Sequence, residues 1–482
     1  MQLMSYGLYI GRNHTADGVA YLAGYGDEPS SHWLEVVPRQ HYPFGTCVTV
    51  GVTPQADLPG RLSDIPQVPC TARHLRVSYS YYKGVPAPLT NGGLNEHGVA
   101  VRDIWSNSRA ELVAITPPDQ SGPNYSDLAR LVLERARTAR EGVELIGALI
   151  KEHGYSDYGG NSHLIADPHE AWVVIELSGG QKLWAAERLG PDSIRASRPG
   201  FIGEIPVHEP THPDYLYAPH LVPFAVEKGW FDPLAGRVFN LNQIYGDAKG
   251  PWAGASWIEA EMARRAALPG KLCMADIVWA IRTERLTGDT AGYGQIMPLH
   301  HPSHDALRVL WHTQIGAIAA PFVPVYMGVR AIPEEYCQHR YLSAGESARF
   351  LDLRHFRNGQ TESVSQVPQG IESTRSASQI FKRLLYLVLQ HSAVFLPEVT
   401  ALWEAVERRL IQASSGVTQT AQILLDAGRS DLAADHIDYF TRTELLAALD
   451  LADTMARSIE ARTRALYGIR TDPEPLTPDQ LW

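Results

Sequence analysis

The chain begins with Met1-Gln-Leu-Met-Ser5-Tyr-Gly-Leu-Tyr-Ile-Gly11. The part after Ser5 is apolar, carries two tyrosines and ends at a glycine, which is typical of a β-strand. Ser5 therefore stands at the head of the first strand. A serine that is the first residue of a mature chain has a particular chemistry, because its hydroxyl can attack while its own α-amine, with a pKa of about 8, accepts the proton. The stretch predicts both a strand and a nucleophile.

Residues 1–4 separate Ser5 from that chemistry, because an internal serine carries an amide nitrogen where the base should be. We expect these residues to be removed, by self-cleavage after Met4 or by translation from Met4 followed by methionine removal. Methionine removal at Met1 would expose Gln2 and would not help. The simpler alternative is that Ser5 is only the polar position of an edge strand.

The composition indicates a globular protein with 44% hydrophobic and 20% charged residues. Its 482 residues leave room for one large domain and a smaller one, or for two to three ordinary domains. A net charge of -11 and the lack of a Lys/Arg run disfavour nucleic-acid binding, and the apolar runs are too short to cross a membrane. The 4 cysteines are scattered without a CxxC spacing, so we expect a cytoplasmic protein with reduced thiols.

The order of the predicted elements indicates two sheets between helical layers. Alternation of apolar and polar residues predicts the strands, and spacing at three and four residues predicts the helices. The expected strands span residues 5–11, 19–24, 32–37, 46–52, 74–82, 99–105, 163–166, 171–177, 182–187, 307–313 and 317–325. The expected helices of this part span residues 126–136, with Ser126 as N-cap, then from 138 or 140 to 154, 256–267 and 275–282.

The composition changes from residue 360 toward Ser, Gln and Thr, and helical periodicity follows after Ser376. We predict a separable C-terminal helical extension there. Its helices either lie across the main domain or form a dimer contact, so the extension leaves a homo-oligomer open. The expected helices span residues 380–389, 398–411, 418–427, 432–437 and 444–466.

A glycine-rich motif, Asn91-Gly-Gly-Leu-Asn95-Glu-His-Gly98, is predicted to form a turn that enters a strand. The glycines allow a tight bend of the backbone. Such a bend can point the amide N–H of Asn95 into a neighbouring site, where it would stabilise an oxyanion. We therefore interpret Asn95 as a candidate catalytic residue beside Ser5.

Together these segments resemble the dipeptidase and secernin family of N-terminal-nucleophile hydrolases, to which bile-salt hydrolases and penicillin V acylases are more distant relatives. The resemblance runs nearly end to end, with an alanine-rich Arg-Glu-Gly helix placed before an Ala-Asp-Pro-x-Glu-Ala-Trp hairpin. The segments that carry it are residues 5–11, Gly24-Tyr-Gly-Asp-Glu-Pro29, Asn91 to Gly98, Ala136-Arg-Thr-Ala-Arg-Glu-Gly142, Leu164-Ile-Ala-Asp-Pro-His-Glu-Ala-Trp172 and Pro321-Phe-Val-Pro-Val-Tyr-Met-Gly328.

The resemblance implies an α+β fold, a four-layer αββα sandwich over residues 5–359, followed by a C-terminal linker and helical extension over 360–482. It implies hydrolysis of a peptide or linear amide bond without a metal or cofactor. Ser5 stands where the family has its catalytic cysteine. Asp27 stands where an aspartate orients the α-amine, and Asn95 where an asparagine helps to bind the oxyanion.

Besides serine in place of cysteine at Ser5, the chain departs from the family pattern at three positions. The arginine usually placed near the end of the second strand falls on Gly24, the asparagine after the meander falls on Arg198, and the distal arginine of the bile-salt branch falls near Trp257. Losing a positioned arginine removes a charge-assisted contact to substrate or oxyanion. Arg198 could restore that charge from the other side, and we take Arg198 and Trp257 as candidate substrate-binding residues.

The predicted activity is therefore that of a dipeptidase or amidase acting on a small peptide or amide. Attack by Ser5 would form an acyl- or peptidyl-serine ester, which water hydrolyses, or which an amine intercepts if the protein is a transferase. The departures at Gly24, Arg198 and Trp257 favour an alternative, a non-hydrolytic member that keeps the fold for binding.

Three further features could form sites. The histidines of His300-His-Pro-Ser-His304 could ligate a metal with Asp305, although proline in the run favours a solvated loop. Cys47 lies in a predicted strand, where a thiol is more often packing than nucleophile. Arg102 and Asp103 indicate either a substrate rim or, more simply, a structural ion pair.

Overall fold

The computed structural model describes residues 5–26, 32–54, 56–79, 89–209, 211–288, 292–337 and 375–468. Two antiparallel sheets form its centre. The six-stranded sheet has the order β14 (Ile194–Ser197), β1 (Tyr6–Ile10), β2 (Ala20–Gly26), β18 (Tyr293–Leu299), β19 (Val309–Thr313) and β20 (Val323–Tyr326). The eight-stranded sheet has the order β16 (Tyr215–Tyr217), β13 (Trp184–Leu189), β12 (Ala171–Glu176), β11 (Asn161–Ala166), β10 (Ala100–Trp105), β9 (Leu89–Asn95), β8 (His74–Tyr79) and β3 (His32–Val37). The expected mixture of helices and antiparallel strands is confirmed.

The two sheets face each other across a shared apolar core. A Cβ added to Gly7 of β1 would lie 2.7 Å from Leu164 Cδ1 and 2.8 Å from Ile104 Cδ1, which belong to β11 and β10. Glycine at this position lets the first strand approach the second sheet closely. Because side chains alternate along a strand, the residues of β1 that share the face of Gly7 point between the sheets.

Helices cover the outer face of the eight-stranded sheet. α2 (Tyr125–Arg135) begins at Asn124, whose side chain forms a capping box with Asp127, and α3 (Ala139–His153) begins at Thr138, whose side chain caps Glu141. Their apolar sides join Val101, Ile165 and other strand residues in a second core. Thr138 caps α3 as the sequence predicts, but α2 is capped by Asn124 and not by the predicted Ser126, whose hydroxyl accepts from the backbone N–H of Thr90.

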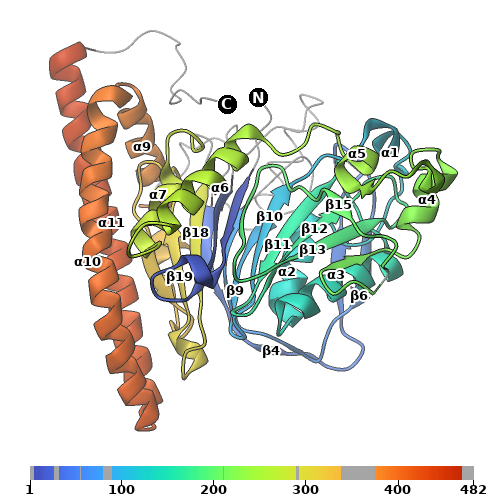
Figure 1. Cartoon of the computed structure of the whole chain (residues 1–482). Helices are drawn as coiled ribbons and strands as arrows, with labels where there is room; N and C mark the ends of the chain where they lie inside the picture. The colour runs from blue at the N-terminus through green and yellow to red at the C-terminus, as the bar shows by residue number, and fades with distance from the viewer. Residues whose placement is uncertain are drawn as a thin grey trace.

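Two more helices lie on the six-stranded sheet, α6 (Ala253–Ala266) against β14 and α7 (Met274–Arg282) against β2 and β18. Figure 1 shows them on the side of the sheet away from α2 and α3. The remaining regular segments are short and peripheral: β4 (Gln40–His41), β5 (Cys47–Gly51), β6 (Leu62–Pro66), β7 (Cys70–Thr71), α1 (Ala110–Ala114), β15 (Glu204–Ile205), α4 (Leu221–Glu227), β17 (Phe239–Asn240), α5 (Leu241–Tyr245) and four 3-10 turns.

The C-terminal part forms α9 (Ala377–Leu389) and two long helices, α10 (Ser392–Asp426) and α11 (Ser430–Tyr467), which Figure 1 shows beside the strands of the six-stranded sheet. The prediction of five shorter helices was wrong, because the described residues of this part form three helices. Gly416 does not interrupt α10, because packing of a long apolar side outweighs the cost of one glycine, about 1 kcal/mol.

The helical extension packs on the main body. Trp403 of α10 donates its indole N–H to the Ala319 carbonyl at 2.8 Å, and the hydroxyl of Tyr326 in β20 donates to the Ser414 carbonyl at 3.0 Å. Trp403 and the strand residues belong to one continuous core. The helices therefore lie across the main domain, while the predicted boundary between residues 359 and 360 falls outside the described residues. None of the described helices is both long and apolar enough to cross a membrane.

Candidate active site

Ser5 lies at the edge of the space between the sheets, immediately before β1, with 7% of its surface exposed. In the pairing of β1 with β2, Tyr6 is opposite Tyr25, so continuing the register by one residue brings Ser5 opposite Gly26. Gly26 is in turn opposite Tyr293 of β18. Three neighbouring strands therefore place Ser5, Gly26 and Tyr293 in one row across the sheet.

This row faces the second sheet. Gly7, Gly24 and Gln295 are register partners across the same three strands, and paired residues share a face. Since Gly7 faces the second sheet and Ser5 is two residues before it, Ser5 faces the second sheet as well. The predicted nucleophile thus points into the protein between the sheets.

Buried polar side chains meet Tyr293 in this space. The Tyr293 hydroxyl donates to Asn91 Oδ1 at 2.9 Å, and Arg102 Nη1 donates to the same hydroxyl at 3.2 Å. Asn91 Nδ2 donates to Asp103 Oδ2 at 2.8 Å, and Asn161 Nδ2 donates to the other oxygen of this carboxylate. We call Asn91, Arg102 and Tyr293 the inter-sheet polar cluster; Asp103 and Asn161 lie on the opposite face of β10 and β11 from Arg102. A connected polar network in an apolar core is costly to leave incomplete, so it marks a candidate functional site.

Arg102 and Asp103 do not form the structural ion pair that the sequence favoured. The Arg102 guanidinium donates to Tyr293 and, at 2.8 Å, to Gln295 Oε1. The Asp103 carboxylate accepts the two asparagine amides instead. Consecutive residues of a strand point to opposite faces, which separates two adjacent side chains.

Asn95 lies at the other end of β9 from Asn91, about 13 Å away along an extended strand. Its Nδ2 donates to the carbonyls of Leu133 and Ala136, at 3.1 and 2.8 Å. Its Oδ1 accepts two backbone N–H groups of its own turn, each at 3.0 Å. The side chain is thus fully used in joining the β9–β10 turn to the end of α2. The geometry does not bring Asn95 to Ser5; the asparagine of β9 that reaches Tyr293, in the row of Ser5, is Asn91.

Arg198 is on the opposite face of the six-stranded sheet from Ser5. Ser197 is opposite Gly7, so Ser197 faces the second sheet and the next residue points away from it. The Arg198 guanidinium contacts the Tyr25 hydroxyl and the Leu286 carbonyl, and lies 4.9 Å from the ring centroid of Trp252. It is therefore buried between the sheet and the start of α6, and the expected return of charge to the Ser5 side is not seen.

Trp257 lies on α6, in the helical layer over the same outer face. Its ring is 6.1 Å from that of Trp279 in α7, and the Arg285 guanidinium lies 4.1 Å from its centroid. Asp27, the fifth predicted site residue, falls outside the described residues. Of the predicted residues whose position is described, only Ser5 borders the inter-sheet polar cluster.

Gly24 cannot carry a side chain in this fold. A Cβ there would lie 2.0 Å from the Tyr6 carbonyl oxygen, so any other residue would force β1 away from β2. The departure from the family pattern at this position therefore has a physical reason, the close approach of the first two strands. A cation near Ser5 has to come from another strand.

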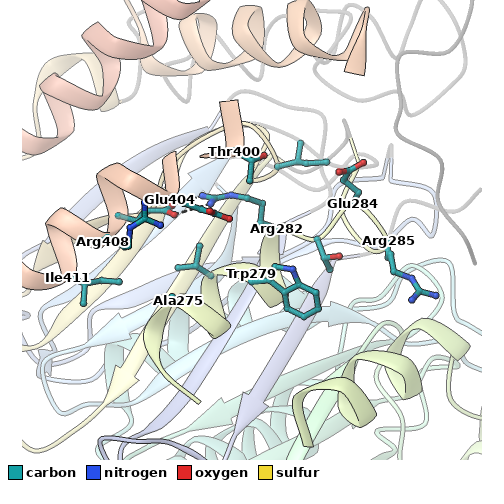
Figure 2. A pocket seen from close by; sticks show the side chains of 13 residues that line it. Ala275, Trp279, Arg282, Glu284, Arg285, Thr400, Glu404, Arg408 and Ile411 are labelled. Atoms are coloured by element: carbon teal, nitrogen blue, oxygen red, sulfur yellow. Dashed lines mark hydrogen bonds and ion pairs between the residues drawn. The ribbon is translucent and has the colours of Figure 1, made fainter. Parts of the chain in front are cut away.

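A cavity of about 630 Å³ lies between α7 and α10 (Figure 2). Arg282 and Glu407 form a buried ion pair in its wall, and Trp279, Glu284, Arg285, Glu404 and Arg408 also line it. The remaining lining residues are Ala275, Val278, Thr283, Ile318, Thr400 and Ile411. None of the predicted site residues is among them, so this cavity is separate from the row that contains Ser5.

The other candidate sites show no metal-binding arrangement. Within the described ranges no group of three or more His, Cys, Asp or Glu side chains could hold an ion. His301 Nε2 lies 3.0 Å from His169 Nε2, and His304 Nε2 lies 2.7 Å from Asp426 Oδ1. Cys47 belongs to β5 but is exposed, so the expectation of a packed thiol was wrong, because the β5–β6 hairpin buries its other positions.

Comparison with known proteins confirms the predicted resemblance to dipeptidases. Residues 79–251 match the model of Peptidase family C69. A protein described as "Probable dipeptidase" from Salmonella dublin is 32% identical over 161 residues, which are 33% of this chain and 35% of that protein. "Probable dipeptidase A" from Streptococcus pyogenes serotype M3 (strain SSI-1) is 34% identical over 153 residues, which are 30% of this chain and 31% of that protein. The chain thus matches about a third of the length of these curated relatives.

Among solved structures, a mutant of the conjugated bile acid hydrolase from Clostridium perfringens is similar to this chain with a TM-score of 0.36 and 12% identity. The alignment covers 67% of this chain and 92% of that one. The family-model match starts at residue 79, so the first two strands and Ser5 lie outside it. The assignment of the nucleophile therefore depends on the geometry around Ser5.

Proposed function

We propose that this protein hydrolyses a peptide or linear amide bond, as a dipeptidase or amidase, with Ser5 as an N-terminal nucleophile. The observation that carries the proposal is the row of Ser5, Gly26 and Tyr293, which faces the inter-sheet polar cluster. The match to Peptidase family C69 supports peptide-bond hydrolysis. We also propose the four-layer αββα fold of N-terminal-nucleophile hydrolases, supported by α2 and α3 on one sheet and α6 and α7 on the other.

Removal of residues 1–4 would turn the Ser5 nitrogen into a free α-amine. The Ser5 oxygen would attack the substrate carbonyl carbon, and the α-amine would take the hydroxyl proton. Collapse of the tetrahedral intermediate would break the C–N bond, and the ammonium would return the proton to the leaving amine. A water molecule activated by the same amine would then hydrolyse the acyl- or peptidyl-serine ester. Asp27, directly after Gly26 in the sequence, would orient the amine.

The geometry favours Asn91 over Asn95 for oxyanion stabilisation. The Tyr293 hydroxyl donates its one proton to Asn91 Oδ1 and so holds the Asn91 amide in place before substrate arrives, while Asn91 Nδ2 carries two protons, one of which is donated to Asp103. Preorganised donors of this kind are worth roughly 3–4 kcal/mol in the transition state. We propose no direct substrate contact for Arg198, since it is buried on the other face of the sheet.

The N-terminal residue of the mature chain tests the proposal. Intact mass of protein made from its native start should correspond to a chain that begins at Ser5, and that form should hydrolyse dipeptides or acyl amides. Ser5→Ala should abolish turnover and shift the melting temperature by only a few degrees, because one hydroxyl contributes little to stability. Ser156→Ala, which removes another buried serine hydroxyl, is the matched control and should keep full activity.

Two results would contradict the proposal. A chain that keeps residues 1–4 and forms no ester with dipeptides or acyl amides would leave Ser5 without its base. Full activity of Ser5→Ala would place the nucleophile elsewhere, and Cys47, exposed in β5, would then be tested by replacement with serine.

The departures at Gly24, Arg198 and Trp257 favour an alternative, a non-hydrolytic binding protein. Interception of the acyl-serine ester by an amine would instead make the protein an acyl or peptidyl transferase. A transferase would pass the acyl group to an added amino acid or peptide amine, and mass spectrometry of the products would show the new amide. A binding protein would retain dipeptides without turnover, measurable by calorimetry. We further propose a cytoplasmic location, supported by the four unpaired cysteines, three of them exposed.

A further inference from the structure

We propose that Arg102 is a positioning residue of this site, which holds the Tyr293 hydroxyl in front of Ser5 and supplies the positive charge of the inter-sheet space. The inference rests on the proposed role of the Ser5 amine as the base. It concerns a residue for which the sequence alone indicated only a substrate rim or half of an ion pair with its neighbour Asp103.

Arg102 is fully buried in the middle of β10. Its Nη1 donates to the Tyr293 hydroxyl at 3.2 Å and to Gln295 Oε1 at 2.8 Å, and its guanidinium carbon lies 5.2 Å from the Tyr293 ring centroid. The Tyr293 hydroxyl donates onward to Asn91. Arg102 therefore orients the tyrosine hydroxyl so that its proton is directed at Asn91.

The buried charge of Arg102 has no counter-ion in the described part of the chain. Its Nη1 bonds go to a hydroxyl and an amide oxygen, and among the described residues its Nε and Nη2 have no hydrogen-bond partner. The nearest acid in sequence, Asp103, accepts from Asn91 and Asn161. Burying an incompletely paired cation costs several kcal/mol, and an apolar residue of similar length would pack there at lower cost. A feature so costly to stability is expected where the charge serves function.

The charge is close to Ser5. Arg102 donates to Gln295, and Gln295 is the register partner of Gly24 in β2. Gly26, two residues after Gly24, is opposite Ser5 when the β1–β2 register is continued by one residue. Neighbouring strands are about 4.8 Å apart and residues rise about 3.3 Å, so the guanidinium lies on the order of 10 Å from the Ser5 nitrogen. Because β2 has no room for a side chain at Gly24, the cation reaches this space from β10 of the opposite sheet.

A cation near an amine disfavours the protonated form, so it lowers the pKa of the amine. Over about 10 Å at an effective dielectric constant of about 20, one charge shifts the equilibrium by roughly one pH unit. Arg102 would thus keep more of the Ser5 α-amine neutral at pH 7, which is the form that accepts the serine proton. A residue with a purely structural role would not move this protonation equilibrium.

Protein that begins at Ser5 is used for the test, as wild type, Arg102→Met and Arg102→Lys. The α-amine is labelled by reductive methylation with ¹³C-formaldehyde and titrated by NMR, a readout that needs no turnover. We expect its pKa to rise by about one unit in Arg102→Met and to stay near the wild-type value in Arg102→Lys. The acidic limb of the pH profile of kcat/KM should move to higher pH by the same amount in Arg102→Met, and should not move in Arg102→Lys. In Arg102→Met, kcat should fall by a larger factor than KM changes.

The matched control is Arg308→Met. Arg308 is another buried arginine, located by Asn95 at the far end of the sheets, where it donates to the carbonyls of Glu96 and His300, each at 2.8 Å. Its loss should lower stability and leave the amine pKa unchanged. If Arg102→Met does not fold, Tyr293→Phe keeps the cation and removes the hydroxyl, and it should lower kcat at least tenfold without moving the acidic limb.

The outcomes separate the two proposals. An amine pKa that is equal in wild type and Arg102→Met overturns the charge assigned to Arg102, whatever the activity. If Tyr293→Phe keeps wild-type kcat, the hydroxyl that Arg102 holds is not part of the site, which also overturns the inference. Absence of hydrolysis by wild-type protein that begins at Ser5, with the amine pKa shifting as expected, would overturn the proposed function alone.

Discussion

The buried ion pair between Arg282 of α7 and Glu407 of α10 should contribute strongly to the free energy that keeps α10 packed on the main body. The side chains are only 6% and 4% exposed. Glu407 accepts from Arg282 Nη1 at 2.9 Å, from Nη2, and from the backbone N–H of Phe322 at 2.8 Å. Glu407→Ala would leave a buried guanidinium without its charge partner and a buried N–H without an acceptor.

Removing one partner of a buried pair costs about 3–5 kcal/mol. We expect the lower end, about 3 kcal/mol, because Arg282 would keep its bonds to the carbonyls of Ala317 and Ala320, at 3.2 and 2.9 Å. The double variant Arg282→Met with Glu407→Leu should recover most of this loss, since it removes both buried charges and refills the space.

Hydrogen exchange measured by mass spectrometry on peptides of α10 is the suitable assay, because it reports opening of this helix without assuming that the whole chain unfolds in one step. A loss of about 3 kcal/mol corresponds to roughly a hundredfold lower protection. Glu404→Ala, at an exposed residue of the same helix that borders the cavity, is the control and should change protection less than about threefold. Equal hydrogen-exchange protection of α10 in the Glu407→Ala and Glu404→Ala proteins would refute the reasoning. Lower protection of α10 in the double variant than in Glu407→Ala would refute it as well.

Two further predictions concern the strands. Gly24→Ala should lower the free energy of unfolding, measured by urea unfolding, by about 1–3 kcal/mol and should reduce turnover. The reason is that its Cβ would lie 2.0 Å from the Tyr6 carbonyl oxygen and push aside the strand that follows Ser5. Gly190→Ala is the control, because a Cβ there meets nothing within 4 Å, and an equal loss in both variants would contradict the prediction. Burial lowers the pKa of His312 to about 4. The unfolded chain therefore binds a proton that the native state does not below about pH 6.5, so stability should fall by up to about 3 kcal/mol as the pH falls from about 6.5 to 4. His312→Gln should flatten this dependence, and an unchanged slope would show that His312 is not its source.

Much of the local structure could be predicted from the sequence. Strand β1, the hairpin of β11 and β12, and helices α2 and α3 lie within a few residues of their predicted positions. In each case the signal is local: alternation of side chains in the strands, and helical spacing with Thr138 as N-cap in the second helix.

Two strands that build the site were missed. β18 contains a glycine and a proline, and β9 was predicted to be a turn because Gly92 and Gly93 interrupt its apolar pattern. Both become strands because their neighbours require it: a Cβ at Gly93 would lie 2.0 Å from the Leu75 carbonyl, so glycine allows β8 and β9 to approach closely. Asn95 was predicted from this turn and from the family resemblance, and the asparagine that contacts Tyr293 is Asn91.

The sequence by itself determined that Ser5 heads a buried first strand, since a short apolar run that ends at a glycine is a local pattern. Only the tertiary structure decided which side chains meet Ser5. Strand order brings Tyr293 into its row from a distant part of the chain, and the facing of two sheets brings Asn91 and Arg102 opposite. The physical reason is that one residue of offset turns a strand side chain to the other face, which places Arg198 on the side of the sheet away from Ser5. The position along a strand matters as well, since Asn95 lies four residues beyond Asn91 at the end of β9.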